Sequence, residues 1–356
     1  MSSNPLVKHR LGGWLAADRA MPTVVALAAF IETTLAVRML FNLALEQVPD
    51  VPPYNQDPTG KSGIRTVAEL MLVFDTVQGQ SPDFIAFPLN AALEWPMATN
   101  VGISLFLRSD VNQYLRDMLN AYGEFLTTSL SASVLNTSSS GWLNEIALGA
   151  IVKFAEPKPT NKLTFADIFA CDPTKPAYGY GSYDAFMTRS FVDGVRPVGS
   201  PDDPNVIVNC CELTPLNNLS GSLVDIMGGS LEDAAPFAGG ALYQAFLPSL
   251  SYHCWHAPTG GTVKKITHIE GPYYAENSLY LQVATRSVML VESDNPAIGV
   301  MAVVPVGMAE VSGCDWKVKE GDRVTEGQLI GMFHFGGSTH LLLFRKGVES
   351  PILVQR

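Results

Sequence analysis

Two consecutive glycines immediately before a serine constrain this chain more than any other feature. They lie in Phe335-Gly336-Gly337-Ser338, which follows the strand-and-turn run Trp316–Leu329 and precedes the apolar run Leu341–Phe344. Glycine adopts backbone conformations that other residues resist, so the simplest interpretation is a glycine bulge or turn between two strands. A second stretch far upstream, Tyr252–Pro258 with the sequence YHCWHAP, raises a chemical alternative for the serine.

Composition excludes several classes of protein. The chain has 356 residues, 47% of them hydrophobic and 16% charged, which fits a folded globule of one large or two ordinary domains. Its net charge of −11 argues against binding to nucleic acid or to an anionic membrane surface, because both attract basic proteins. Five scattered cysteines without a CxxC pair predict reduced thiols and a cytoplasmic location.

One N-terminal segment, Thr23–Leu45, has the apolar character of a candidate membrane span. Its longest uncharged run, Thr23–Ile31, is about half as long as the roughly 20 residues that a spanning helix needs, and Glu32 and Arg38 interrupt the remainder of the segment. We therefore predict an amphipathic or buried helix and no stable membrane insertion. Met1–Arg19 mixes charges and glycines and lacks the uninterrupted apolar core of a signal peptide.

Hydrophobic spacing divides the chain into a helical part and a β-rich part. Val67–Phe74 and Val111–Phe125 carry apolar residues at helical spacing, and Ser109-Asp110 is a suitable N-terminal cap for the second segment. Strand-like runs come after residue 260: Gly261–Ile269, Leu279–Val283, Val288–Val291, Val300–Val306 and the hairpin-like Val311–Ile330. The pattern predicts an α+β fold, with a helical region over 1–164 and a mainly antiparallel β domain over 165–356.

Histidines supply the most informative candidates for chemistry. The chain has only six: His9, His253, His256, His268, His334 and His340. His253 and His256 lie at i and i+3, a spacing compatible with zinc, but no HExxH motif and no Cys/His set of finger spacing accompanies them. We therefore predict no metal site. A general-base role requires an imidazole beside a hydroxyl nucleophile, held by a carboxylate.

Taken together, the YHCWHAP stretch and Phe335–Thr339 resemble the phosphatidylserine decarboxylase family. Its members carry a YHxxHxP segment and then, near the C-terminus, a Gly-Ser dipeptide, usually within LGST or GGSS. Ser182–Phe186, Arg189 and Arg196-Pro197 are similar to the family's aromatic and RP segment, while Gly313–Gly331 resembles the hairpin before its cleavage site. This likeness covers roughly residues 165 to 346.

The helical part also resembles the accessory region that fungal members carry ahead of the catalytic domain, especially at Gly141–Glu145. A particular likeness is to the soluble fungal decarboxylases that act on L-tryptophan, which share FHFGGS and YHxWHAP. The resemblance therefore implies a helical accessory region followed by a catalytic domain of the phosphatidylserine decarboxylase type.

The resemblance implies a self-processing, pyruvoyl-dependent decarboxylase. Ser338 would attack the carbonyl of Gly337, and elimination and hydrolysis would convert Ser338 into an N-terminal pyruvoyl group. That ketone would form a Schiff base with a substrate amine and accept the electrons left by departing CO2. His256 matches the family's base for self-cleavage, and His253 matches the histidine linked to decarboxylation. Glu212 stands where the family has an orienting aspartate; the alternative is an ordinary surface carboxylate after a strand.

The implied substrate is an amino acid, most directly an aromatic one such as L-tryptophan, which would give tryptamine. Two alternatives stay open: a phosphatidylserine decarboxylase that makes phosphatidylethanolamine, and a degenerate homologue that never matures. A carrier domain is disfavoured, because Lys317 and Lys319 lack the expected Met-Lys or Asp-Lys context. The short piece from Ser338 onward contains one strand's worth of apolar sequence, so we expect the cleaved chains to remain associated.

Overall fold

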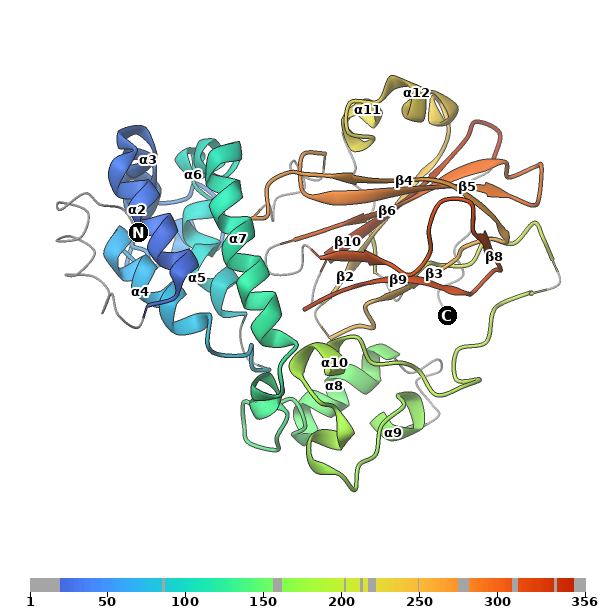
Figure 1. Cartoon of the computed structure of the whole chain (residues 1–356), viewed down its shortest axis with the longest axis horizontal. Helices are drawn as coiled ribbons and strands as arrows, with labels where there is room; N and C mark the ends of the chain where they lie inside the picture. The colour runs from blue at the N-terminus through green and yellow to red at the C-terminus, as the bar shows by residue number, and fades with distance from the viewer. Residues whose placement is uncertain are drawn as a thin grey trace.

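The structure is a computed structural model, and it describes residues 20–84, 87–155, 162–201, 203–211, 214–216, 222–248, 250–274, 282–308, 313–335 and 338–348. Helices from the first part of the chain form one lobe, and strands from the second part form the other (Figure 1). The predicted order, helices first and antiparallel strands second, is therefore confirmed.

The helical lobe is built mainly from α-helices that bury an apolar face. Its elements are α2 (Pro22–Thr33), α3 (Leu35–Glu46), η1 (Tyr54–Gln56), α4 (Val67–Val77), α5 (Pro88–Met97), α6 (Asn100–Phe106), α7 (Ser109–Leu126), η2 (Ser129–Val134), α8 (Glu145–Ala155), α9 (Phe165–Ile168), η3 (Pro176–Gly179) and α10 (Tyr183–Met187). Helix α4 begins with a capping box in which Thr66 and Glu69 bond each other's backbone N–H groups. Helix α7 begins at Ser109, so the N-cap position belongs to Arg108 and not to the expected Ser109-Asp110.

The predicted helix over Thr23–Leu45 is two helices. Helices α2 and α3 are bent by 104° at the break between them. Each buries its own apolar face, with Val24 and Leu27 of α2 and Val37 of α3 fully buried, so packing directs the chain around the corner. Within the described ranges no single helix is long and apolar enough to cross a membrane, although this bent pair passes the same test by length and composition.

The β-rich part contains two antiparallel sheets. Its elements are β1 (Thr214–Leu216), α11 (Leu223–Ile226), α12 (Leu231–Ala234), η4 (Ala235–Phe237), β2 (Leu242–Leu247), β3 (Cys254–His256), β4 (Gly261–Ile269), β5 (Arg286–Ser293), β6 (Val300–Val306), β7 (Cys314–Trp316), β8 (Arg323–Val324), β9 (Leu329–Phe333) and β10 (Ser338–Phe344). The larger sheet has the order β1-β2-β10-β6-β5-β4-β8, and the smaller has the order β3-β9-β7.

Several predicted strands correspond to observed ones. Gly261–Ile269 and Val300–Val306 are β4 and β6, and Val288–Val291 lies inside β5. The predicted hairpin Val311–Ile330 is divided, because β7 pairs with β9 whereas β8 pairs with β4. Most of the predicted strand Leu279–Val283 lies outside the described residues.

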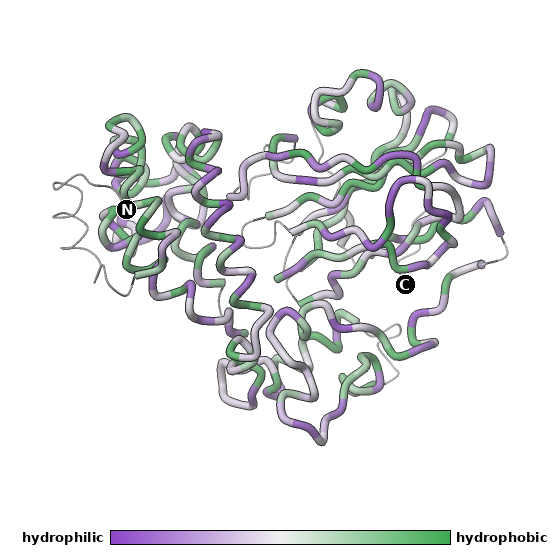
Figure 2. The backbone as a smooth tube through the Cα atoms, viewed as in Figure 1, coloured by the Kyte–Doolittle hydropathy of each residue, from purple (hydrophilic) through white to green (hydrophobic). Residues whose placement is uncertain are grey.

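Packing arranges these elements in layers. Helices α11 and α12 cover one face of the larger sheet, where Ile226 and Met227 pack with Val304 and Leu341. The smaller sheet covers the opposite face, and Trp255 lies in the core between the two sheets. Figure 2 shows hydrophobic residues along the strands and more hydrophilic ones in the connecting turns.

Helix α7 joins the helical lobe to the sheets (Figure 1). Asn112 Oδ1 accepts a hydrogen bond of 3.2 Å from the backbone N–H of Tyr273, and Arg116 forms an ion pair of 2.6 Å with Glu270. The core of the helical lobe also includes Tyr252, which belongs to the YHCWHAP stretch. The helical lobe therefore packs directly against the YHCWHAP stretch, which the sequence predicts to carry catalytic residues.

Candidate active site

Ser338 is the first residue of β10 and is fully buried. It is paired with Leu247 of β2, and its hydroxyl has no hydrogen-bond partner within the described part of the chain. Strand alternation puts Ser338 on the same side as His340 and Leu342, and Leu342 packs in the core between the sheets. A buried hydroxyl without a partner is costly, so this position is unusual for a purely structural serine.

Strand β3 carries the histidine pair and lies beside β9, the strand that leads toward Ser338. The backbone N–H of Phe333 donates a hydrogen bond of 2.9 Å to the carbonyl oxygen of His253. Cys254 pairs with Met332, and the Trp255 and Phe333 rings meet edge to face at 4.6 Å. The fold therefore brings the two sequence stretches into contact, although about 80 residues separate them along the chain.

His253 is a buried, neutral imidazole. Burial, reinforced by the nearby Arg189 guanidinium and opposed by the backbone of Ser251, lowers the pKa of His253 to about 3. Neither ring nitrogen makes a hydrogen bond of ordinary geometry with another described residue. Arg189 in turn donates hydrogen bonds of 3.0 and 3.3 Å to the carbonyl oxygens of Leu250 and Ser251, which fixes the loop before His253.

His256 is held at both ring nitrogens. Nδ1 lies 2.7 Å from the carbonyl oxygen of Gly327, and because a carbonyl only accepts, the proton of the neutral ring is on Nδ1. Nε2 is then the acceptor for the Tyr252 hydroxyl at 3.0 Å. Burial lowers the pKa of His256, while the bond to Gly327 opposes that shift. A neutral ring with a basic Nε2 is the form that a general base requires.

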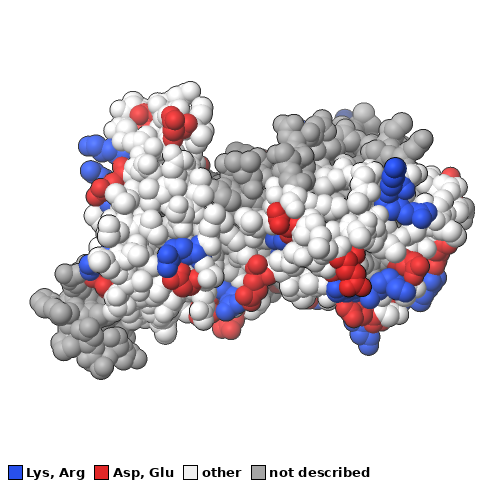
Figure 3. Space-filling model, turned by 90° about the horizontal axis from the view of Figure 1, so that it is seen from above, with Lys and Arg blue, Asp and Glu red and all other residues white. Residues whose placement is uncertain are grey.

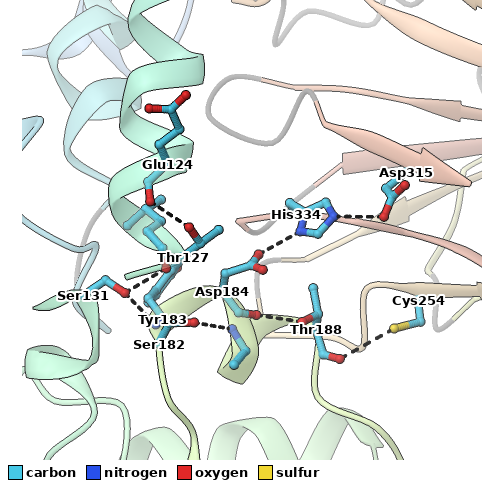
Figure 4. A network of polar contacts seen from close by, with 12 residues as sticks. Glu124, Thr127, Ser131, Ser182, Tyr183, Asp184, Thr188, Cys254, Asp315 and His334 are labelled. Atoms are coloured by element: carbon cyan, nitrogen blue, oxygen red, sulfur yellow. Dashed lines mark hydrogen bonds and ion pairs between the residues drawn. The ribbon is translucent and has the colours of Figure 1, made fainter. Parts of the chain in front are cut away.

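A third histidine, His334, is clamped between two carboxylates (Figure 4). Its Nδ1 lies 2.9 Å from Asp184 of α10, and its Nε2 lies 3.5 Å from Asp315 of β7. The hydrogen bond to Asp184 is the main cause of a raised pKa for His334, and the charges of Asp184 and Asp315 reinforce it against the effect of burial. Only the protonated ring can donate to both carboxylates.

Hydrogen bonds connect α10 to η2 and, through Thr188, to β3 (Figure 4). The backbone N–H of Tyr183 donates to the Ser131 hydroxyl at 2.9 Å. The Thr188 hydroxyl donates to the carbonyl oxygen of Asp184 at 2.8 Å, and the Cys254 thiol contacts the carbonyl oxygen of Thr188 at 3.9 Å. Helix α10 therefore links the rest of the helical lobe to His334 and to the histidine-bearing strand.

His340 is a further buried imidazole, two residues after Ser338. Burial lowers its pKa to about 3, and neither ring nitrogen has a hydrogen-bond partner in the described ranges. Its neighbours across the sheet are Ala245 and Pro305. A neutral imidazole with unused polar atoms therefore lies on the same side of β10 as the serine.

Three of the predicted site residues, Ser338, His253 and His256, lie in the described structure. Neither histidine is hydrogen-bonded to Ser338. Gly337 and Glu212 lie outside the described residues. No group of three or more His, Cys, Asp or Glu side chains that could hold a metal ion is present in the described ranges, and the five cysteines are free thiols.

Sequence reasoning missed the residues around His334. His334 and Asp184 are 150 positions apart, yet each lies in a stretch that the resemblance had already singled out. The available signal was a basic residue, His334, in one of these stretches and an acidic residue, Asp184, in the other. His340 carried no signal, because a lone histidine in an apolar run is compatible with simple burial.

Comparisons with known proteins identify the class of protein. Two family models, both described as phosphatidylserine decarboxylase, match residues 21–151 and 183–356. The chain is 33% identical over 316 residues to decarboxylase iboD of Amanita muscaria, covering 78% of this chain and 89% of that protein. It is 30% identical over 379 residues to an L-tryptophan decarboxylase of Psilocybe cubensis, covering 94% of this chain and 82% of that protein. Phosphatidylserine decarboxylase proenzyme 3 of Schizosaccharomyces pombe is 27% identical over 69% of this chain and 28% of its own length.

The family models and these relatives define a carboxy-lyase, an enzyme that removes a carboxyl group as CO2. The chain belongs to the phosphatidylserine decarboxylase family.

Proposed function

We propose that this chain is a self-processing, pyruvoyl-dependent amino-acid decarboxylase, and that it converts L-tryptophan to tryptamine. The observation that carries the proposal is the position of Ser338. Its buried hydroxyl has no partner among the described residues, it directly follows Gly336-Gly337, and it opens a central strand. A hydroxyl in such a place is available for reaction with the carbonyl group that precedes it.

The cleavage step is derived from these residues. Ser338 Oγ attacks the carbonyl carbon of Gly337, His256 takes up the hydroxyl proton, and the amide bond gives way to an ester. Elimination then expels the Gly337 carboxylate, and addition of water with release of ammonia leaves a ketone on the new N-terminus. His256 must exchange Tyr252 for the serine, because Tyr252 holds its Nε2 in the structure.

The carbonyl oxygen of Gly327 occupies the place on His256 that a carboxylate would fill. The Gly327 carbonyl therefore already orients this imidazole, and we propose that Glu212 contributes to the same task. Glu212→Gln should slow self-cleavage if the carboxylate contributes, and an unchanged rate would make Glu212 an ordinary surface residue.

The surroundings of Ser338 suit a pyruvoyl group. Such a group supplies the ketone that takes up the substrate amine and the electron pair left by CO2. His253 and His340 are neutral and buried, and neither ring makes a hydrogen bond of ordinary geometry with another described residue, so each has a nitrogen that can hold or move a proton. We assign His253 to decarboxylation because it stands at the motif position that the family resemblance links to that step.

Support for an aromatic amino acid comes from the Psilocybe cubensis relative, which is described as an L-tryptophan decarboxylase. The buried rings of Trp255 and Phe333 do not add to it, because they pack in the core between the sheets. The substrate proposal therefore depends on the relatives, and the self-cleavage proposal depends on Ser338.

Mass spectrometry tests maturation directly. The purified protein should consist of two chains divided before residue 338, with the smaller one blocked by a pyruvoyl group, and Ser338→Ala should remain one chain. An intact, unmodified wild-type protein that nevertheless releases CO2 would refute the mechanism. A wild-type protein that is intact and inactive would identify a degenerate homologue.

A substrate assay separates the two remaining functions. Matured protein should release CO2 and tryptamine from L-tryptophan without detergent or added pyridoxal phosphate, and phenylhydrazine, which reacts with ketones, should abolish this activity. Turnover of phosphatidylserine in vesicles, with no turnover of aromatic amino acids, would establish the lipid alternative.

A further inference from the structure

Phe335 has an unusual backbone conformation two residues before the cleavage site. Its φ is +74°, in the left-handed region that residues with a Cβ rarely adopt. Such a conformation persists only where the surroundings hold it, and it is often found at functional positions. The surroundings of Phe335 therefore require an explanation.

Gly123 of α7 provides one side of that environment. A Cβ added to this glycine would lie 2.9 Å from Cε2 and 3.1 Å from Cζ of Phe335, closer than carbon atoms pack. Gly123 is itself buried, so the ring lies against bare helix backbone. The absence of a side chain at Gly123 thus leaves the space that the Phe335 ring fills.

The residue before Phe335 is held from the other side. His334 bridges Asp184 of α10 and Asp315 of β7, and its Nδ1 lies 2.9 Å from Oδ1 of Asp184. Asp184 has a side chain only 15% exposed, and the ion pair is therefore less screened than a surface pair. Two consecutive residues before the glycines are thus anchored, one on α7 and one between α10 and β7.

We propose that His334 and Phe335, together with Gly123, Asp184 and Asp315, form a clamp through which the helical lobe positions the Gly337 carbonyl for attack by Ser338. This inference rests on the self-cleavage proposed above. Glycine permits more backbone conformations than other residues, and a two-glycine link between Phe335 and Ser338 has fewer of them when both ends are fixed, Phe335 by the contact with Gly123 and Ser338 by its pairing in β10. The clamp residues are positioning residues and do not touch the reacting atoms.

Gly123→Ala tests the clamp, with Gly149→Ala as the matched control. Both glycines lie inside helices, but a Cβ at Gly149 meets nothing within 4 Å. We expect Gly123→Ala to slow self-cleavage of newly translated precursor by about tenfold, because the methyl group displaces the ring. Gly149→Ala should cleave at the wild-type rate. Tryptamine formation per matured chain should stay within about twofold of wild type for both, since the clamp acts before cleavage.

Phe335→Leu supplies the contact-specific control. It removes the ring atoms that a Cβ at position 123 would meet, so adding Gly123→Ala to the Phe335→Leu background should change the cleavage rate by less than about twofold. A tenfold effect in both backgrounds would show that the methyl group acts elsewhere, and the clamp would be wrong. Equal cleavage of Gly123→Ala and Gly149→Ala would also overturn it.

The contact between His334 and Asp184 is tested by a change at a partly buried position. Asp184→Asn removes a carboxylate from His334 and should slow cleavage severalfold, while Asp193→Asn, at an exposed site, should not. Wild-type cleavage by both aspartate variants would disprove the role of His334. If wild type and Gly149→Ala also remain uncleaved, the self-cleavage proposal is wrong and the clamp is wrong with it. If wild type and Gly149→Ala cleave, and the clamp variants cleave at the same rate, only the clamp is wrong.

Discussion

At the scale of single residues, the protonation of His256 determines how self-cleavage depends on pH. Burial lowers its pKa below the ordinary value of 6.5, so the neutral, basic form prevails at pH 7 and persists somewhat below pH 6.5. We expect the cleavage rate of the precursor to fall in acidic buffer and to reach half of its maximum below pH 6.5. A time course of cleavage in buffers of different pH measures it, and a half-maximal rate above about pH 7 would contradict His256 as the base.

The pKa shift of His334 has the opposite sign to that of His256. Its pKa is raised in the folded protein by Asp184 and then Asp315, so its protonated form stabilises the fold. That contribution is fully present below the unfolded pKa of about 6.5 and is lost as pH rises through the higher folded value. We therefore expect His334→Gln to lower the free energy of unfolding more at about pH 6 than at about pH 9.

Denaturant unfolding at the two pH values provides the measurement for His334. The exposed His268→Gln on β4 is the control, and its effect on stability should be small at both. An effect of His334→Gln that is equal in the acidic and the alkaline buffer would mean that the ion pairs with the carboxylates contribute nothing to stability.

At the scale of elements, local patterns predicted those structures that local forces determine. Val67–Phe74 became α4 because its apolar spacing and the capping box of Thr66 and Glu69 agree. Thr23–Leu45 could not be predicted correctly, since the 104° bend results from how α2 and α3 pack and not from a strong breaker. Motifs located Ser338 and the histidine pair, but the contact between Phe335 and α7 depends on tertiary packing that no motif encodes.

Strand β10 lies between β2 and β6 in the larger sheet, so cleavage before Ser338 would leave a central strand as a separate chain. Every residue of β10 is buried. We expect the two chains to co-elute in native gel filtration and to separate only in concentrated guanidinium chloride. Elution of the small chain by itself under native conditions would contradict this expectation.

The same strand should contribute strongly to stability. Leu342 is fully buried between the sheets, and Leu342→Ala should lower the free energy of unfolding by about 2–5 kcal/mol through lost burial and a cavity. Leu130→Ala is the control, because Leu130 is 73% exposed and its loss should cost less than about 0.5 kcal/mol. Similar costs for the two variants would show that β10 is loosely packed.

At the scale of the whole molecule, surface charge bears on whether the substrate is a lipid. The chain carries a net charge of −11, and the face in Figure 3 shows basic side chains mixed with acidic ones rather than a uniformly basic area. Anionic phosphatidylserine repels such a surface unless apolar contacts compensate. The relevant apolar feature is a stripe on α3 formed by Leu35, Met39 and Leu43, which are 62%, 54% and 46% exposed.

Three side chains bury little area, and a single short apolar stripe gives weak attachment at most. We therefore expect the protein to stay at the bottom of the gradient when it is floated with phosphatidylserine vesicles, and the vesicles to leave tryptamine formation unchanged. Flotation with the vesicles would contradict this and would favour the lipid alternative. The combined variant Leu35→Ser, Met39→Ser and Leu43→Ser would then locate the cause: if it no longer floats, α3 is the membrane contact, whereas continued flotation places the contact on another surface.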